Sequence, residues 1–359
     1  MHFPSVARLA LIAGMAGLSV MAVAPAAMAR KPPVIEAPPM PPPPPPMPDV
    51  SMAHKFVAAA GAYDDYIRQA SSISPAFADA GGVGQSLRAG SAYEPGQLRN
   101  GMVAYAAIAV LTDQAFVNAV RASAPLPDDR YALVRKIFSD PKAALQFADG
   151  TRAAGIAKRA LVSGGMRLYD TGNSVRLAAY SIQHEPWSLQ PVPDIDTRTD
   201  VIKRLSSAQR SSPRDETQTL DLMVAGEPPG GAALDPAPGP YTGLVVRAVA
   251  LAALAAIGEA DDEMAPHLGW LTDDYYLDHC LAEAKLAEFE CLAVARPNYE
   301  DVFCLGQHAM KDTGACVVIG AGGAVPIDIM VKPLAVPPAR MHPAPTKRGR
   351  HSTGGVAKA

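Results

Sequence analysis

From about residue 51 onward, apolar residues recur at every third or fourth position, which is the spacing of amphipathic helices. The pattern predicts helices near residues 51–73, 95–123, 127–138 and 150–185, separated by glycine and proline residues. Aromatic residues make up only 6% of the chain while alanine is abundant, and this balance favours closely packed helices over sheets. We therefore predict an all-α fold, with several helices forming the main domain.

The longest predicted helix, 150–185, carries one apolar stripe that is partly built from glycine and alanine. Its members are Ile156, Ala160, Gly164, Leu168, Gly172, Val175, Ala179 and Ile182. Small residues on such a stripe allow a neighbouring helix to approach closely. Each glycine also weakens helix propensity by about 1 kcal/mol relative to alanine, so a break near Gly164-Gly165 is an alternative.

Two regions rich in proline divide the chain. Residues 30–50 include the proline run 41–46, which favours the extended polyproline II conformation, so we expect a stiff linker there. Residues 227–241 are rich in proline and glycine and predict a surface loop. This loop separates a helical domain at 51–226 from a second helical segment at 242–331.

The second segment begins with an apolar stretch, Leu244–Ile257, whose only charged residue is Arg247. The stretch is shorter than the ~20 residues that a helix needs to cross a membrane. We expect a buried helix.

The N-terminus has the features of a cleavable signal peptide, which we place at residues 1–29. Arg8 precedes an apolar run from Leu9 to Val23, and Ala27-Met28-Ala29 provides the small-residue cleavage site. The apolar run is also shorter than the ~20 residues of a membrane span. We expect an exported protein, periplasmic or secreted, with no transmembrane span after cleavage.

Charge is distributed unevenly along the chain. The net charge is −3, but residues 332–359 contain six cations and no acid, so the body of the protein is strongly acidic. We expect this basic tail to be disordered. Its cations Lys347, Arg348 and Arg350 are candidates for binding an anionic component of the cell envelope, although a solvated chain end would have the same composition. No aromatic residue alternates with these cations, so we predict no nucleic-acid partner.

All four cysteines lie within residues 280–316, and an even number of cysteines in an exported chain predicts disulfides. Cys280 and Cys291 fall on one face of a helix that we expect to be capped by Thr272 and to end at Arg296. At 1.5 Å per residue they lie about 16 Å apart, which exceeds the ~7 Å that a disulfide allows. These two cysteines therefore bond to other partners.

Pro297 ends this helix, and we expect a second helix to fold back antiparallel from Asn298 and to end at Thr313-Gly314. Cys291 with Cys304, and Cys280 with Cys316, are both centred on the same turn near residue 298. The crossed pairing, Cys280 with Cys304 and Cys291 with Cys316, has no common centre. We predict an antiparallel helical hairpin with two nested disulfides, Cys291–Cys304 and Cys280–Cys316.

Residues 272–316 resemble the twin-cysteine coiled-coil-helix hairpin of small intermembrane-space proteins. Ten residues separate Cys280 from Cys291 and eleven separate Cys304 from Cys316, which are wider spacings than in that family. The resemblance implies a disulfide-stapled helical hairpin and no shared activity.

A metal site is the alternative for the same residues, because His279 adjoins Cys280 and His308 follows Cys304 by four positions. The spacing fits no C-x2-C zinc pattern, and thiols of exported proteins usually oxidise. We predict no metal ion and no cofactor.

The strongest candidate for chemistry is the end of the 150–185 helix, where His184, Glu185 and Trp187 follow one another closely. His184-Glu185 begins like a zinc-protease motif, but Ser188 stands in place of the second histidine. A histidine and a proline are also expected at an ordinary helix terminus. Our leading hypothesis is a non-enzymatic structural or binding component of the cell envelope. The alternative is an envelope hydrolase with a site at these three residues.

Overall fold

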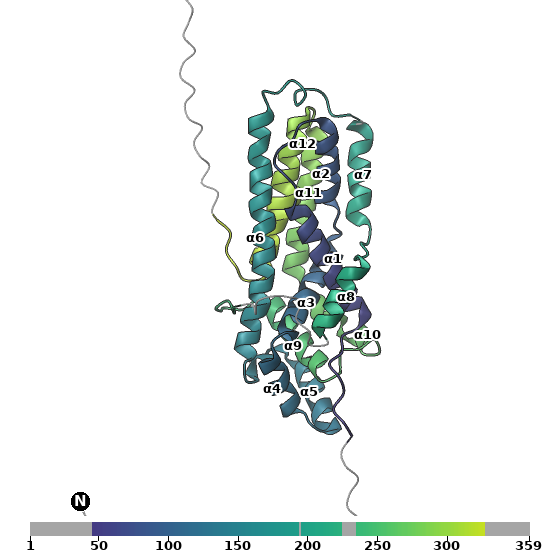
Figure 1. The fold of residues 1–359 in the computed structure, drawn as a ribbon, viewed down its shortest axis with the longest axis vertical. Helices are drawn as coiled ribbons and strands as arrows, with labels where there is room; N and C mark the ends of the chain where they lie inside the picture. Colours follow the sequence, from purple (N-terminus) through teal and green to yellow (C-terminus); the bar gives the residue numbers. More distant parts are fainter. Residues whose placement is uncertain (1–44, 194, 225–234, 327–359) are drawn as a thin grey trace, which may run out of the picture. The chain divides into compact units, whose positions relative to one another are not determined.

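The computed structural model describes residues 45–193, 195–224 and 235–326, and this part of the chain contains helices and no β-strand, which confirms the all-α prediction (Figure 1). The α-helices are α1 (His54–Ser71), α2 (Ala80–Ser91), α3 (Pro95–Leu111), α4 (Gln114–Ser123), α5 (Pro127–Ser139), α6 (Gly150–Ile182), α7 (Ile195–Ser207), α8 (Arg214–Val224), α9 (Gly243–Ala256), α10 (Ala265–Leu268), α11 (Tyr275–Val294), α12 (Asn298–Cys304) and α13 (Thr313–Gly320). Two short 3₁₀-helices, η1 (Pro141–Gln146) and η2 (Gly269–Thr272), and one π-helix, η3 (Leu305–Asp312), complete the set.

Some predicted features lie outside the described residues. These are the signal peptide at 1–29, the linker up to residue 44, the loop residues 227–234, and the tail 332–359 with Lys347, Arg348 and Arg350.

The centre of the fold is formed by α3 and α9, which pack against each other. From Leu244 to Ala256, every residue of α9 except Arg247 is buried, as expected for a helix that is apolar on nearly all sides. The predicted buried helix is therefore confirmed. One continuous cluster of buried residues includes side chains from both predicted segments, 51–226 and 242–331.

The stretch predicted as one helix at 95–123 is two helices, because the chain bends between α3 and α4 at Thr112 and Asp113. Among the described residues, no single helix has the length and apolarity to cross a membrane, whereas α3 and α4 taken together do, at a bend of 88°.

The sequence patterns also missed α2, because three of its first five residues are glycines. Glycine lowers helix propensity, so the segment looked like a loop. In the fold the Asp79 side chain caps the helix by accepting a hydrogen bond from the Gly82 amide at 2.8 Å, and Val83 and Leu87 are buried. Tertiary burial of this face compensates for the weak local propensity.

The longest helix, α6, runs unbroken through Gly164-Gly165 and packs along a continuous helix made of α12, η3 and α13 (Figure 1). A Cβ atom on Gly172 would lie 2.8 Å from the Gly306 carbonyl oxygen, and one on Gly314 would lie 2.8 Å from the Gly165 carbonyl oxygen. The backbones of the two helices are thus in direct contact. This confirms that the small residues of the predicted stripe admit a close neighbour.

Gly306 lies in the π-helix η3 and Gly314 at the start of α13, and both pack directly against the backbone of α6. The sequence had predicted that the second helix ends at Thr313-Gly314, and this is wrong. Gly314 packs against the backbone of α6, and the helix continues to Gly320.

The C-terminal hairpin has the predicted nested disulfides, Cys280–Cys316 and Cys291–Cys304, each with Cα atoms 5.7 Å apart. Such bonds form in an oxidising environment. The first helix of the hairpin begins two residues later than expected, because Asp274, and not Thr272, accepts the capping hydrogen bond from the Leu277 amide at 2.9 Å.

We expect the two disulfides to contribute unequally to stability. Cys280–Cys316 closes a sequence separation of 36 residues and Cys291–Cys304 one of 13. The chain-entropy relation then predicts losses in the free energy of unfolding of about 4 kcal/mol for Cys280→Ser/Cys316→Ser and about 3 kcal/mol for Cys291→Ser/Cys304→Ser. Urea denaturation of the two double variants measures both values. A larger loss for the shorter loop would contradict this prediction.

Candidate functional site

An apolar pocket of about 320 Å³ lies where α6, α11 and α12 meet, next to the Cys291–Cys304 disulfide. Tyr180, Val294 and Phe303 are among the residues that line it, and the Tyr180 and Phe303 rings lie 6.1 Å apart in an edge-to-face arrangement. Tyr180 is 51% exposed and Val294 is 72% exposed, so large apolar side chains of the pocket reach the solvent, while Gln183 and Glu300 add polar groups to its lining. This combination suits an apolar ligand group.

The pocket adjoins a polar cluster carried by the π-helix. His308 Nδ1 lies 2.8 Å from Asp312 Oδ2, and Gln307 Nε2 donates to Asp312 Oδ1 at 2.8 Å. Because the carboxylate only accepts, this contact places the His308 proton on Nδ1 and leaves Nε2 as an acceptor in the neutral ring. The His308 ring packs edge-on against Phe303, which lines the pocket. The spacing of His308 and Asp312, four residues apart, is the only sequence signal for this pair.

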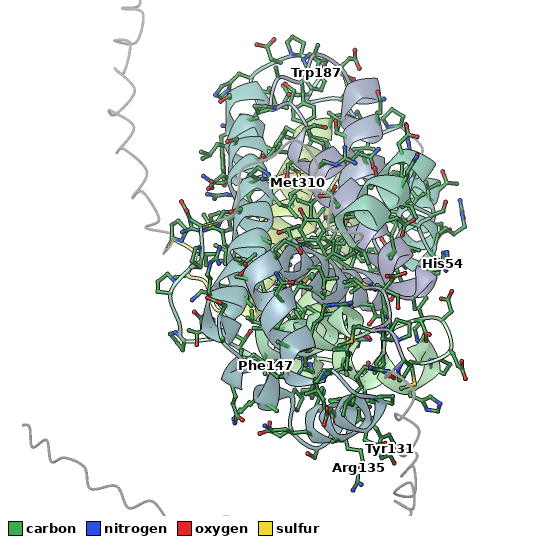
Figure 2. The ribbon with its side chains drawn as sticks, turned by 60° about the horizontal axis from the view of Figure 1, so that its bottom comes forward. His54, Tyr131, Arg135, Phe147, Trp187 and Met310 are labelled. Atoms are coloured by element: carbon green, nitrogen blue, oxygen red, sulfur yellow. A yellow bond between two sulfur atoms is a disulfide. The ribbon has the colours of Figure 1, made fainter. Side chains whose placement is uncertain are left out.

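His184 and Glu185 lie on an exposed turn that follows α6 and do not line the pocket. Trp187, labelled in Figure 2, is partly buried against the core. Ser188 is fully buried and its hydroxyl donates to the Ile182 carbonyl at 2.5 Å, which closes the end of α6. The local geometry therefore accounts for Ser188 and Trp187 as parts of a helix terminus.

A second cavity, of about 250 Å³, lies between α2 and α7 beside a buried ion pair. Arg198 Nη1 donates to both carboxylate oxygens of Asp301 at 2.6 and 2.8 Å, and Arg198 Nη2 donates to the Leu292 carbonyl. Through this one side chain α7 is anchored to the end of α11 and to the start of α12. Sequence reasoning missed this pair because its members are 103 residues apart.

Burial raises the pKa of the Asp301 carboxyl to about 6, although Arg198 opposes the shift; nearby Glu300 adds to it. The folded protein then binds a proton at a higher pH than the unfolded chain does. The resulting stabilisation is present below pH 4 and is lost as the pH rises through 6, amounting to about 3 kcal/mol.

We therefore expect the free energy of unfolding of the wild type, relative to Asp301→Asn, to fall by about 3 kcal/mol between pH 4 and pH 7. Urea denaturation of both proteins across this range is the measurement. A difference that stays constant or grows with pH would show that Arg198 keeps Asp301 ionised throughout.

Another buried ion pair, Lys285 with Glu288, lies in the core between α11 and α2, and burial lowers the pKa of the Lys285 ammonium. Lys285 Nζ is 3.0 Å from Glu288 Oε2, donates to the Ser91 carbonyl at 2.6 Å and lies 3.8 Å above the Tyr93 ring. The Ser91 hydroxyl donates to Glu288. Since Ser91 and Glu288 have no exposed surface, this network is structural.

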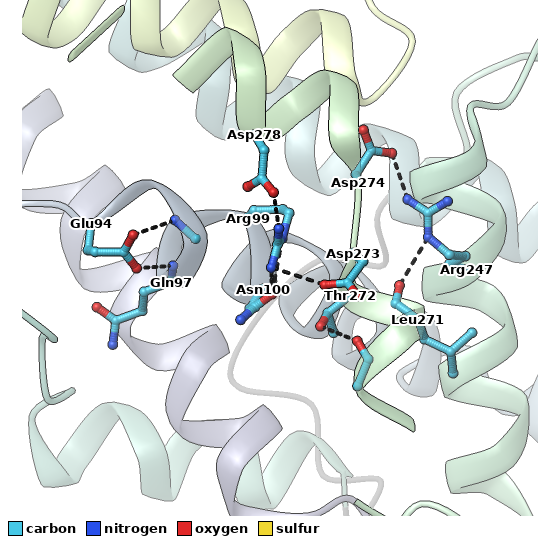
Figure 3. A network of polar contacts seen from close by, with 12 residues as sticks. Glu94, Gln97, Arg99, Asn100, Arg247, Leu271, Thr272, Asp273, Asp274 and Asp278 are labelled. Carbon is cyan, nitrogen blue, oxygen red and sulfur yellow. Dashed lines mark hydrogen bonds and ion pairs between the residues drawn. The ribbon is translucent and has the colours of Figure 1, made fainter. Parts of the chain in front are cut away.

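A third cavity, of about 660 Å³, lies between α1, α3, residues 209–210 and η2, and it is lined by polar and apolar groups together. Figure 3 shows the polar network at one edge of this cavity, centred on Arg99. Across the described parts of the chain, no group of three or more histidine, cysteine, aspartate or glutamate side chains is arranged to hold a metal ion.

No protein-family model, curated protein or solved structure matches this chain. Its function therefore has to be argued from its own geometry.

Proposed function

We propose that this protein is an exported, non-enzymatic binding component of the cell envelope, and that the pocket between α6, α11 and α12 takes an apolar group of its partner. The observation that carries the proposal is the pocket itself, in which a disulfide joins two of the three elements and most of the lining residues are apolar. Its volume is at the lower end of ligand sites, which span about 300–1,000 Å³, so it fits one ring or a short acyl segment.

Export is supported by the signal-peptide pattern at 1–29 and by the two disulfides. The proline-rich linker at 30–50 would hold the helical body away from the membrane or the export machinery. The hydrolase alternative has less support, because His184 and Glu185 lie on an exposed turn and do not line the pocket.

The apolar pocket can be tested with the oxidised mature protein, residues 30–359, and the fluorescent probe N-phenyl-1-naphthylamine. We expect saturable fluorescence enhancement with the wild type and at least a ~10-fold loss of affinity for Val294→Glu, because an added carboxylate in the pocket lining disfavours an apolar ligand. Leu286→Glu is the matched control, since Leu286 lies on the same helix, is 50% exposed and does not line the pocket. Equal affinities in all three proteins, or no enhancement by the wild type, would refute the proposal.

We further propose that Lys347, Arg348 and Arg350 bind an anionic envelope surface. Sedimentation with vesicles containing phosphatidylglycerol compares residues 30–359 with residues 30–331. The longer protein should bind at low salt and dissociate as salt is raised. Equal sedimentation of the two would eliminate the role of the tail.

A further inference from the structure

The third cavity, of about 660 Å³, presents unpaired polar groups in a fixed orientation. Its walls come from α1, the first turns of α3, residues 209–210, and the 3₁₀-helix η2 with the residue that follows it. It shares no residue with the apolar pocket of the proposed function. The two sites can therefore be tested separately.

Arg99 fixes the orientation of Asn100 at the edge of this cavity (Figure 3). Its guanidinium donates to Asn100 Oδ1 twice, from Nε at 3.2 Å and from Nη2 at 2.9 Å. Because a guanidinium only donates, the oxygen of the Asn100 amide must face it and the NH₂ group must point the other way. Arg99 is itself held by ion pairs to Asp278 and Asp273.

The Asn100 NH₂ group has two N–H donors that meet no acceptor within the described residues, and Asn100 lines the cavity. Asp273 lies at the same edge, is 69% exposed and uses one carboxylate oxygen, Oδ1, to contact Arg99 at 3.2 Å. Its second oxygen can accept hydrogen bonds from a ligand. The cavity thus offers two donors and a strong acceptor, from two residues that both contact Arg99.

The other charged groups of the cavity are occupied by the protein. Lys55 donates to the Ala265 carbonyl, Arg210 pairs with Asp65, and both oxygens of Glu94 accept amide hydrogens at the start of α3. The Ala265 carbonyl does not cancel the charge of the Lys55 ammonium, so the cavity keeps one cation, Lys55, and one anion, the half-used Asp273 carboxylate. Because these two charges balance, the cavity offers no net charge for an ionic ligand to neutralise. Ala58 and Ala59 add a small apolar surface to the wall.

We propose that this cavity binds an uncharged, hydroxyl-rich saccharide, with Asn100 donating to the ligand and Asp273 accepting from its hydroxyl groups. A sugar has donors and acceptors around its rim and apolar C–H faces, and it carries no charge that would have to be neutralised. The cavity volume lies within the usual range for small-molecule sites, about 300–1,000 Å³. Arg99 acts as a positioning residue, since its two hydrogen bonds hold the Asn100 amide in the donating orientation.

The test uses the mature protein, residues 30–359, and chitobiose, the disaccharide of N-acetylglucosamine, in calorimetric titrations. We expect saturable binding by the wild type and at least a ~10-fold loss of affinity for Asn100→Asp, which keeps the side-chain shape and the acceptor for Arg99 but removes both donors. Asn173→Asp is the matched control, because Asn173 Oδ1 also accepts from an arginine, Arg176, at 2.8 Å but lies on α6 away from the cavity.

A second readout separates binding from a change in folding. In ¹⁵N–¹H spectra of the wild type, the side-chain NH₂ signals of Asn100 should shift on addition of chitobiose while those of Asn173 stay in place. Thermal unfolding of Asn100→Asp should match that of Asn173→Asp. The absence of saturable binding by the wild type, equal affinity in Asn100→Asp, or unshifted Asn100 signals would each overturn the assignment, whatever the result at the apolar pocket.

Discussion

Gly306→Ala is expected to lower the free energy of unfolding by about 3 kcal/mol or more, because there is no space for a methyl group between α6 and η3. A Cβ atom on Gly306 would lie 2.7 Å from the Arg176 Cα atom and 2.8 Å from the Gly172 carbonyl oxygen. Both are backbone atoms of α6 and cannot rotate out of the way. The two helices would have to separate along their shared contact, which also contains Gly165 and Gly314.

Gly269→Ala is the matched control for this substitution. Gly269 begins η2 with φ of −55°, and no atom lies within 4 Å of the Cβ position. Its replacement should leave stability unchanged or raise it by about 0.4–1 kcal/mol, because alanine reduces the conformational entropy of the unfolded chain. Urea denaturation followed by circular dichroism compares the two. Equal stability of Gly306→Ala and Gly269→Ala would show that the α6–η3 contact is looser than described.

Lys285→Met is expected to cost about 3–5 kcal/mol, because it removes one partner of a buried ion pair and leaves the other charge without compensation. Glu288 is fully buried, and its remaining contact would be the hydroxyl of Ser91. The lysine also holds the Ser91 carbonyl at 2.6 Å and packs on the Tyr93 ring at 3.8 Å. Its removal therefore loosens α2 from α11 as well.

The double variant Lys285→Met/Glu288→Leu distinguishes this cause from simple loss of packing. Replacing both charges with apolar side chains removes the uncompensated carboxylate, so we expect most of the lost stability to return. Lys136→Met, at an exposed lysine that donates to Gln146 at 3.1 Å, should change stability by no more than about 0.5 kcal/mol. If the double variant is as unstable as Lys285→Met alone, the lost stability comes from packing and not from the uncompensated carboxylate.

The candidate sites were less accessible to sequence reasoning than the fold was. The pattern drew attention to His184 and Glu185, which are neighbours in sequence, but the structure places them on an exposed turn. The groups that do come together are remote along the chain: Arg99 and Asp278 are 179 positions apart, and Ser91 and Glu288 are 197 apart. Local spacing has no information about such pairs, because they form only when helices pack.

The sequence by itself determined the helical class, the buried helix at 244–257, the close-packing stripe on α6 and the nested pairing of the four cysteines. Each of these follows from the period of the helix or from the geometry of a single turn, so a short stretch of chain is sufficient. Only the tertiary structure decided that Gly314 continues its helix, that glycine-rich α2 is helical, and which charges share the core and the cavities. Hydrophobic periodicity specifies which face of a helix is buried but not which partner covers it, and the partner determines where backbones touch and which side chains meet.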